Sequence, residues 1–121
     1  MTPFGMAVRR MRAERGVSQR DMARALGVSS AYLSALEHGR RGRPSWEFVQ
    51  KSIGYFNIIW DEAEALQALA ELSDPRVTVD TIGLSSEATA LANRFAALVR
   101  DLDSETIARL DAILAESEKA S

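Results

Sequence analysis

Apolar residues recur every three or four positions through most of this chain, which is the spacing of one face of an α-helix. Glycine, proline and serine interrupt the repeat and divide it into short segments. Before Pro75 the pattern predicts a mostly α architecture of five short helices. The predicted helices span residues 3–15, 19–26, 30–38, 44–56 and 60–72.

Residue types at the ends of these segments support the predicted boundaries. Ser18 and Ser29 are predicted N-caps, because a serine hydroxyl accepts a hydrogen bond from a free N–H group of the first helical turn. Gly16, Gly27 and Gly39 are predicted to end the first three helices. The apolar stripes and the aromatic residues of the last two helices form the predicted core. Its members are Phe4, Val8, Met11, Met22, Ala23, Leu26, Leu33, Leu36, Trp46, Phe48, Val49, Ile53, Tyr55, Phe56 and Trp60.

The pattern changes after Pro75. Val77 and Val79 alternate with polar residues, and this period of two predicts a short strand over residues 76–81. A lone strand cannot satisfy its own backbone, so we expect it to pair with another strand, such as its copy in a second subunit.

Two amphipathic helices are predicted beyond the strand. Ser85 or Ser86 caps the first helix, and the second begins at residues 103–104. Their apolar faces are too large to stay exposed, so they either pack on the first five helices or form a dimer interface, which we favour. The chain is therefore predicted to divide into a domain of residues 1–73 and a dimerisation or partner-binding segment of residues 74–121.

Charge is distributed unevenly along the chain, although the net charge is only −2. Residues 1–55 contain ten basic and four acidic residues, a balance of +6. Residues 56–121 contain five basic and thirteen acidic residues, a balance of −8. This asymmetry predicts a polyanionic partner for the first half only, and it leaves the acidic half free for a protein partner.

Composition and motifs exclude several classes of protein. The chain has no cysteine, so neither a disulfide nor a thiolate metal site is possible, and His38 is its only histidine. No apolar run reaches the roughly 18 residues of a membrane span, and the N-terminus lacks the order of a signal peptide. The chain is therefore predicted to be cytoplasmic, without a membrane contact. In the absence of catalytic or phosphate-cradling motifs, we expect neither an enzyme nor a cofactor.

The second and third predicted helices are short and are separated by a tight turn, which is the arrangement of a helix-turn-helix whose second helix enters the major groove of DNA. Over RRMRAERGVSQRDMARALGVSSAYLSALEHGRRGRP, and more weakly over roughly residues 6–72, the chain resembles the Cro/cI-type (XRE) helix-turn-helix family. The resemblance implies a five-helix, lambda-repressor-like domain that binds double-stranded DNA. The matching positions are Ser18-Gln19, Ala23, Leu26-Gly27-Val28-Ser29, Leu33-Ser34, Glu37 and Gly39.

The resemblance also implies roles for individual residues. Glu37 is expected to form a structural ion pair with Arg12 of the first helix. Direct readout of bases is expected to be thin, because serine bonds to several bases and alanine mainly touches a thymine methyl group. The base-edge candidates are Ser30, Ala31, Tyr32, Ser34 and Ala35. The candidates for phosphate or minor-groove contact are Gln19, Arg20, Ser29, His38, Arg40, Arg41 and Arg43.

A surface of this kind is expected to take its affinity from phosphates, and its specificity from DNA shape and the spacing of two copies. The predicted function is a transcriptional regulator that binds a palindromic operator as a homodimer, by default as a repressor. Activation and an antitoxin that represses its own operon are variants of this hypothesis. A rival hypothesis is a protein-interaction module that contacts RNA polymerase or another regulator. The small side chains of the reading helix favour the rival, and the arginine cluster argues against it.

Overall fold

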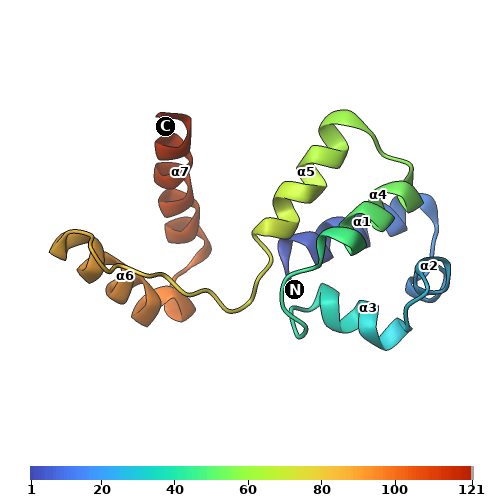
Figure 1. Ribbon diagram of the computed structural model, residues 1–121, viewed down its shortest axis with the longest axis horizontal. Helices are drawn as coiled ribbons and strands as arrows, with labels where there is room; N and C mark the ends of the chain where they lie inside the picture. The colour runs from blue at the N-terminus through green and yellow to red at the C-terminus, as the bar shows by residue number, and fades with distance from the viewer. Residues whose placement is uncertain (121) are drawn as a thin grey trace. The chain divides into compact units, whose positions relative to one another are not determined.

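Five short helices form the first part of the chain, as the sequence pattern predicts (Figure 1). They are α1 Pro3–Arg15, α2 Gln19–Leu26, α3 Ser30–Glu37, α4 Trp46–Phe56 and α5 Trp60–Glu71. The computed structural model describes residues 1–120 and divides into two units, Met1–Val77 and Thr78–Ser121. In the first unit, α3 packs against α1 and α2, and α5 packs against α1 and α4. The five helices thus surround one core.

Serine hydroxyls cap the N-termini of three of these helices. The Ser18 Oγ accepts a hydrogen bond from the N–H of Asp21 at 3.0 Å. The Ser29 Oγ accepts one from the N–H of Tyr32, also at 3.0 Å. Each bond satisfies a donor that has no partner within its own helix, and both predicted caps are confirmed. Ser45 caps α4, so this helix begins two residues later than the pattern predicts.

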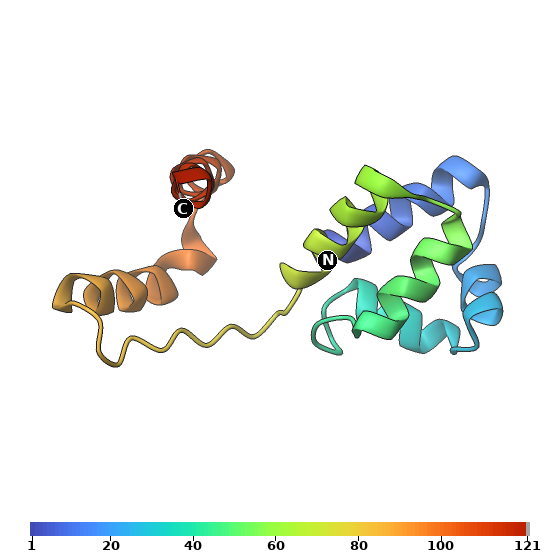
Figure 2. The same cartoon turned by 45° about the horizontal axis from the view of Figure 1, so that its top comes forward.

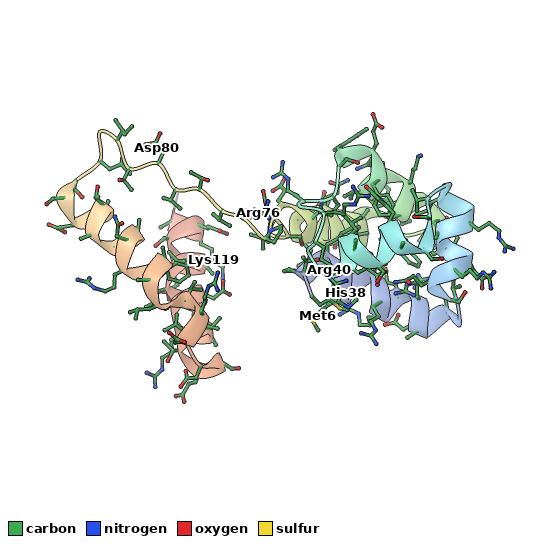
Figure 3. The ribbon with its side chains drawn as sticks, turned by 90° about the horizontal axis from the view of Figure 1, so that it is seen from below. Met6, His38, Arg40, Arg76, Asp80 and Lys119 are labelled. Atoms are coloured by element: carbon green, nitrogen blue, oxygen red, sulfur yellow. The ribbon has the colours of Figure 1, made fainter. Side chains whose placement is uncertain are left out.

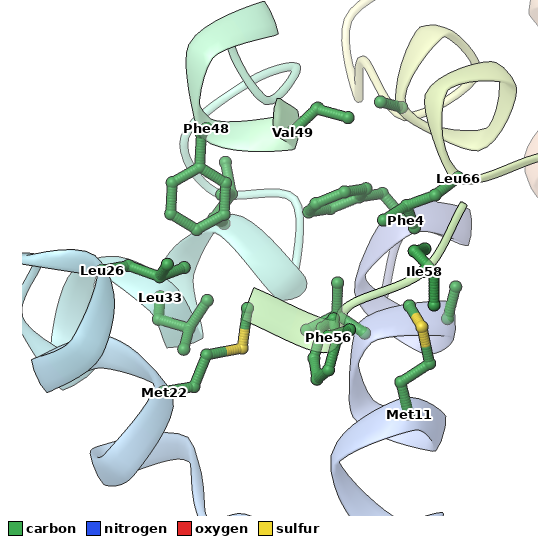
Figure 4. Packing of buried hydrophobic residues seen from close by; sticks show 14 of the residues in the cluster. Phe4, Met11, Met22, Leu26, Leu33, Phe48, Val49, Phe56, Ile58 and Leu66 are labelled. Atoms are coloured by element: carbon green, nitrogen blue, oxygen red, sulfur yellow. The ribbon is translucent and has the colours of Figure 1, made fainter. Parts of the chain in front are cut away.

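Apolar side chains from all five helices fill the core (Figure 4). The ring of Phe48 lies edge-on to the ring of Phe4, with the two centroids 6.3 Å apart, and joins α4 to α1. Most buried positions lie on the predicted stripes, so removing them from water stabilises the arrangement that the pattern predicts. The buried apolar residues are Phe4, Ala7, Val8, Met11, Met22, Ala23, Leu26, Leu33, Leu36, Phe48, Val49, Phe56, Ile58, Leu66 and Ala70.

The two tryptophans are exceptions to the predicted core. Trp46 and Trp60 occupy the first positions of α4 and α5, where they are 73% and 80% exposed. A helical side chain leans toward the N-terminus of its helix, so Trp46 at the first position extends past the end of the packed segment. Trp60 has a left-handed φ of 53° and does not share the helical backbone geometry of the residues that follow it. The prediction that these two side chains belong to the core is therefore wrong.

The prediction of a strand over residues 76–81 is also wrong. The described chain, residues 1–120, contains helices and irregular segments but no strand (Figures 1 and 2). Val77 and Val79 are exposed, so their alternation does not mark a buried face. The fold is mostly α, as predicted, without the strand.

Local hydrogen bonds explain why this segment is irregular. The Asp74 Oδ1 accepts a hydrogen bond from the N–H of Arg76 at 3.0 Å. The Asp80 Oδ1 accepts one from the N–H of Ile82 at 2.9 Å. Asp74 therefore uses a backbone donor at the start of the predicted strand, and Asp80 forms a turn at its end. No second strand is present in residues 1–120 to supply a ladder.

The second unit contains two α-helices and a short 3₁₀ helix, which are α6 Ser86–Leu98, η1 Val99–Asp101 and α7 Ser104–Ala120. The Ser85 Oγ caps α6 by accepting from the N–H of Ala88, and the Asp103 Oδ1 caps α7 by accepting from the N–H of Thr106. Hydrogen bonds from the side chain and backbone of Thr106 hold the pKa of the Asp103 carboxyl below its usual range. Neither of these helices, nor any other in the described chain, is both long and apolar enough to cross a membrane.

The helices of the second unit leave their apolar side chains accessible. None of the residues described between positions 78 and 120 is buried. Because no side chain among these described residues is buried, this pair of helices gains little of the packing that normally stabilises helices in proteins. The exposed large apolar residues of these helices are Leu91, Phe95, Leu98, Val99, Ile107, Ile113 and Leu114.

The start of α1 meets the end of α3 at Gly5, where there is no room for a side chain. A Cβ atom at this position would lie against the carbonyl oxygen of Glu37 and 2.7 Å from its Cα. The N–H of Thr2 donates to the same carbonyl oxygen at 3.0 Å, and the Thr2 Oγ1 accepts from the N–H of Gly5 at 3.0 Å. The first turn of α1 is therefore seated directly on the backbone of α3.

Gly5→Ala is expected to lower the free energy of unfolding by about 3 kcal/mol, because the added methyl group meets backbone atoms that cannot rotate away. Gly54→Ala is the matched control, since Gly54 lies within α4 with open space around it. Alanine is the better residue in a helix by about 0.5–1 kcal/mol, so the control is expected to be stabilised. Urea denaturation followed by circular dichroism measures both changes. An unchanged midpoint for Gly5→Ala would contradict the close approach.

Candidate nucleic-acid interface

A tight turn at Gly27 joins α2 to α3. Gly27 has a left-handed φ of 74°, which glycine adopts without strain. The N–H of Val28 donates to the carbonyl oxygen of Ala23 at 2.9 Å and closes the end of α2. Two short helices joined by such a turn form a helix-turn-helix, in which α3 is the second helix.

One side of α3 is buried and the other is accessible. Leu33 and Leu36 are buried and hold the helix against the core. The opposite side carries only small side chains, which allow a close approach to a groove but offer few hydrogen-bonding groups. These partly or fully exposed residues are Ser30, Ala31, Ser34 and Ala35, four of the five predicted base-edge positions.

Tyr32, the fifth predicted base-edge residue, differs from the other four because its side chain contacts other residues of the domain. Its half-buried ring is edge-on to the ring of Phe48, with centroids 6.0 Å apart and an interplanar angle of 66°. The guanidinium carbon of Arg41 is 5.3 Å from the centroid of the Tyr32 ring. The ring therefore contacts both a core side chain and the loop that follows α3.

Glu37, the last residue of α3, is 1% exposed. The Nη2 of Arg12 in α1 lies 2.8 Å from one carboxylate oxygen of Glu37 and 2.9 Å from the other. The Nε2 of Gln19 in α2 donates to the same carboxylate at 3.3 Å. The Glu37 side chain thus joins three helices. The structure brings together the two residues expected to pair, and it adds Gln19, which the sequence analysis assigned to phosphate.

Burial affects the acidity of Glu37. The loss of hydration raises the pKa of its carboxyl above the usual range, while the charge of Arg12, the hydrogen bond from Gln19 and the charge of His38 oppose this shift. Arg12 is buried as well, and its Nε has no hydrogen-bond partner within residues 1–120. Removing either charge would leave the other buried without compensation, so this pair fixes the position of α3.

The loop after α3 carries three exposed arginines, Arg40, Arg41 and Arg43. Figure 3 labels Arg40 and His38 on the surface of the first unit. The Nδ1 of His38 lies 2.8 Å from the carbonyl oxygen of Ser34, which places the imidazole ring against the end of α3. The loop therefore presents guanidinium groups beside the helix.

The other two predicted phosphate contacts lie at helix N-termini. Arg20 is exposed in the first turn of α2. Ser29 is exposed at the N-cap of α3, where its hydroxyl already accepts the N–H of Tyr32. Guanidinium groups and free N–H groups at helix N-termini both bind anions.

The described residues do not form a metal centre. Nowhere in residues 1–120 do three or more His, Cys, Asp or Glu side chains gather in a way that would hold a metal ion. The chemical groups around α3 are hydroxyls, methyl groups and guanidinium groups, which suit hydrogen bonding and ion pairing with a polyanion.

No pattern in the sequence indicates the residues that hold α1 against its neighbours. The Thr2 Oγ1 lies 3.4 Å from the Glu37 carbonyl oxygen, to which it donates. The N–H of Phe4 donates to the Ser73 Oγ at 2.9 Å. These partners are 35 and 69 positions apart in the chain, so no local pattern indicates that they meet.

Arg12→Met is expected to lower the free energy of unfolding by about 3–5 kcal/mol, because it leaves the Glu37 carboxylate buried without its cation. The double variant Arg12→Met/Glu37→Leu removes both charges and is expected to regain much of the loss. Arg9→Met, at an exposed position of α1, is the control and should change stability by less than about 0.5 kcal/mol. Urea denaturation compares the variants. A double variant less stable than Arg12→Met would refute the uncompensated charge as the cause.

The first part of the chain is similar in sequence to known proteins. Residues 3–53 match the family model described as a helix-turn-helix domain. A curated protein of Bacillus subtilis (strain 168), the uncharacterized HTH-type transcriptional regulator RghRB, is 31% identical over 65 residues. That match covers 54% of this chain and 47% of the relative, so the chain spans about half the length of the curated protein.

Among solved structures, a chain of a SinR protein/SinI protein complex is similar at a TM-score of 0.44 and 21% identity, with 98% of this chain and 99% of that chain covered. The match to the family model lies in the first unit, where it covers α1 to α3 and most of α4. The first unit is thus similar to known helix-turn-helix domains, in keeping with its resemblance to the Cro/cI-type (XRE) helix-turn-helix family.

Proposed function

We propose that this chain is a DNA-binding transcriptional regulator whose α3 enters the major groove. The observation that carries the proposal is the division of α3 into two sides. Leu33, Leu36 and Glu37 are buried, while small side chains and a loop with three exposed arginines remain accessible. A helix held at the surface in this way fits a major groove about 12 Å wide. The name of the relative, an HTH-type transcriptional regulator, supports the proposal.

Phosphates are the proposed source of affinity. The loop arginines and Arg20 bind phosphate oxygens without regard to base sequence, and the basic first half of the chain favours approach to DNA. Ser30 and Ser34 offer single hydrogen bonds to bases, so sequence preference is proposed to come mainly from DNA shape and from the spacing of two half-sites. Gln19 and Tyr32 also have partners inside the domain, so a contact of either residue with DNA would compete with these interactions or add to them.

The second unit is proposed to join two copies of the chain. Its described helices bury no side chain, although they carry a row of large apolar residues. A unit of roughly 40 residues usually needs disulfides, metals or oligomerisation to fold, and this chain has no cysteine. Pairing through α6 and α7 would bury the apolar residues. It would also present two helix-turn-helix units to half-sites about one helical turn apart, as on a palindromic operator.

Repression is the proposed default outcome, because a dimer bound over a promoter blocks polymerase. Activation through contact with polymerase is the second candidate, and the excess of acidic residues after position 55 supports it. An antitoxin that represses its own operon would act through the same dimer. A reporter gene behind the protein's own promoter separates the two signs, since overproduction lowers expression under repression and raises it under activation.

DNA binding is expected to depend steeply on salt. The probe is a duplex that the wild-type protein selects from a random-sequence library, and its affinity is measured by fluorescence anisotropy. With about six phosphates neutralised, the slope of log K against log salt concentration should be about −5. The triple variant Arg40→Ala/Arg41→Ala/Arg43→Ala should lose about one unit of slope for each phosphate contact removed. A slope near zero for the wild type would exclude DNA binding and favour a protein-interaction module.

Leu91→Glu is expected to convert a dimer to a monomer, because it places a charge within the proposed apolar interface. Leu91 is 63% exposed, so the substitution does not disturb packing within the described unit. Ala97→Glu places the same charge on the opposite side of α6 and serves as the matched control. Light scattering at micromolar concentration measures the mass. A monomeric wild-type protein would refute the proposed homodimer.

A further inference from the structure

We infer that Tyr32 positions Arg41 for the DNA, and that Arg41 makes the dominant contact among the loop arginines. This inference rests on the proposed DNA-binding function and deepens it. It assigns Tyr32 the role of a positioning residue, and it assigns a single arginine most of the affinity that three exposed arginines would otherwise share.

A chain of ring contacts fixes Tyr32 from the core outward. The rings of Phe4 and Phe48 are edge-on with centroids 6.3 Å apart, and the rings of Phe48 and Tyr32 are edge-on at 6.0 Å. Phe4 and Phe48 are both buried, so the Tyr32 ring leans on side chains that have little freedom to move. The guanidinium carbon of Arg41 lies 5.3 Å from the centroid of this ring.

The contact with the Tyr32 ring places the guanidinium group of Arg41 back along α3, toward the N-terminus of the helix. In the sequence, Arg41 lies four positions beyond Glu37, the end of the helix, whereas Tyr32 lies in the first turn of the helix. Tyr32 lies five positions before Glu37 in the helix, an axial distance of about 7.5 Å. Stacking on Tyr32 therefore moves the guanidinium toward the N-terminal half of α3, the part of a reading helix that contacts base edges.

The same contact favours Arg41 over its neighbours. A guanidinium group stacked on a ring has already lost part of its freedom, so it loses less on binding a phosphate or a base. The side chains of Arg40 and Arg43 have neither a ring contact nor an ion pair within residues 1–120. Since the accessible side of α3 carries only serine and alanine, Arg41 supplies the strong donor that the helix itself lacks.

The experiment measures binding of a duplex that the wild-type protein selects from a random library, with a scrambled duplex of equal length for comparison. Arg41→Ala is expected to weaken binding of the selected duplex about tenfold, the effect of losing a specific contact. Arg40→Ala, the matched control, is expected to weaken it about threefold or less. Arg41→Lys keeps the charge but loses the planar group, and should stay several-fold weaker than the wild type.

Tyr32 is tested by rescue and by coupling. Tyr32→Phe keeps the ring and should bind within about twofold of the wild type, whereas Tyr32→Leu should be weakened about threefold to fivefold. The double variant Tyr32→Leu/Arg41→Ala should bind like Arg41→Ala alone, because the two residues act as one unit. Thermal melting checks that the variants are folded. The arginine comparison leaves Tyr32 intact and decides the inference even if Tyr32→Leu does not fold.

The outcomes separate the inference from the proposed function. A wild-type protein without salt-dependent binding to the selected duplex would refute DNA binding and the inference with it. A wild type that binds, with Arg41→Ala no weaker than Arg40→Ala, would overturn the inference alone. Equal losses for Tyr32→Phe and Tyr32→Leu would also overturn it, since they would show that the hydroxyl itself contacts the DNA.

Discussion

The buried carboxylate of Glu37 determines how α3 is held, because three helices meet at this residue. Its oxygens bind Arg12 of α1 and Gln19 of α2, while its carbonyl oxygen accepts the N–H of Thr2. Its backbone also excludes any side chain at Gly5. A charge removed from water is costly unless it is paired, so a shift of any one helix would weaken several contacts at once. The contacts of Glu37 at the C-terminal end of α3 therefore fix the position of the helix and of its accessible side.

This anchoring fixes the position of the accessible side of α3, although that side carries few hydrogen-bonding groups. Serine and alanine leave α3 smooth, so the groups that can attract a polyanion lie mostly in the loop that follows. Tyr32 connects the two, since its ring contacts Phe48 in the core and Arg41 in the loop. Weak contacts by each copy make the proposed pairing through the second unit valuable, because linked sites bind with an avidity that neither has alone. If the proposed function holds, the rigid anchoring of α3 and the pairing of two copies would together compensate for thin direct readout.

The failed predictions share a cause. The apolar stripes do not show which part of a helix has a neighbour, so Trp46 and Trp60 were assigned to the core although they project beyond it. Alternation at Val77 and Val79 resembles a strand, but a strand exists only where another chain segment supplies the ladder. The assignment of Gln19 to phosphate came from its place at a helix N-terminus and stays a prediction, while the tertiary structure adds a hydrogen bond from its amide to the buried Glu37 carboxylate.

The order of the helices, their serine caps, the Gly27 turn and the buried stripes were determined by the sequence itself, because each depends on residues within a few positions of one another. The resemblance to a known family predicted the ion pair of Arg12 and Glu37, although the two residues are 25 positions apart in the chain. Tertiary structure alone decided the rest. The seat of α1 on α3, the approach at Gly5 and the stacking of Arg41 on Tyr32 all depend on where distant segments meet. Tertiary packing determines those contacts, and local propensity cannot predict them.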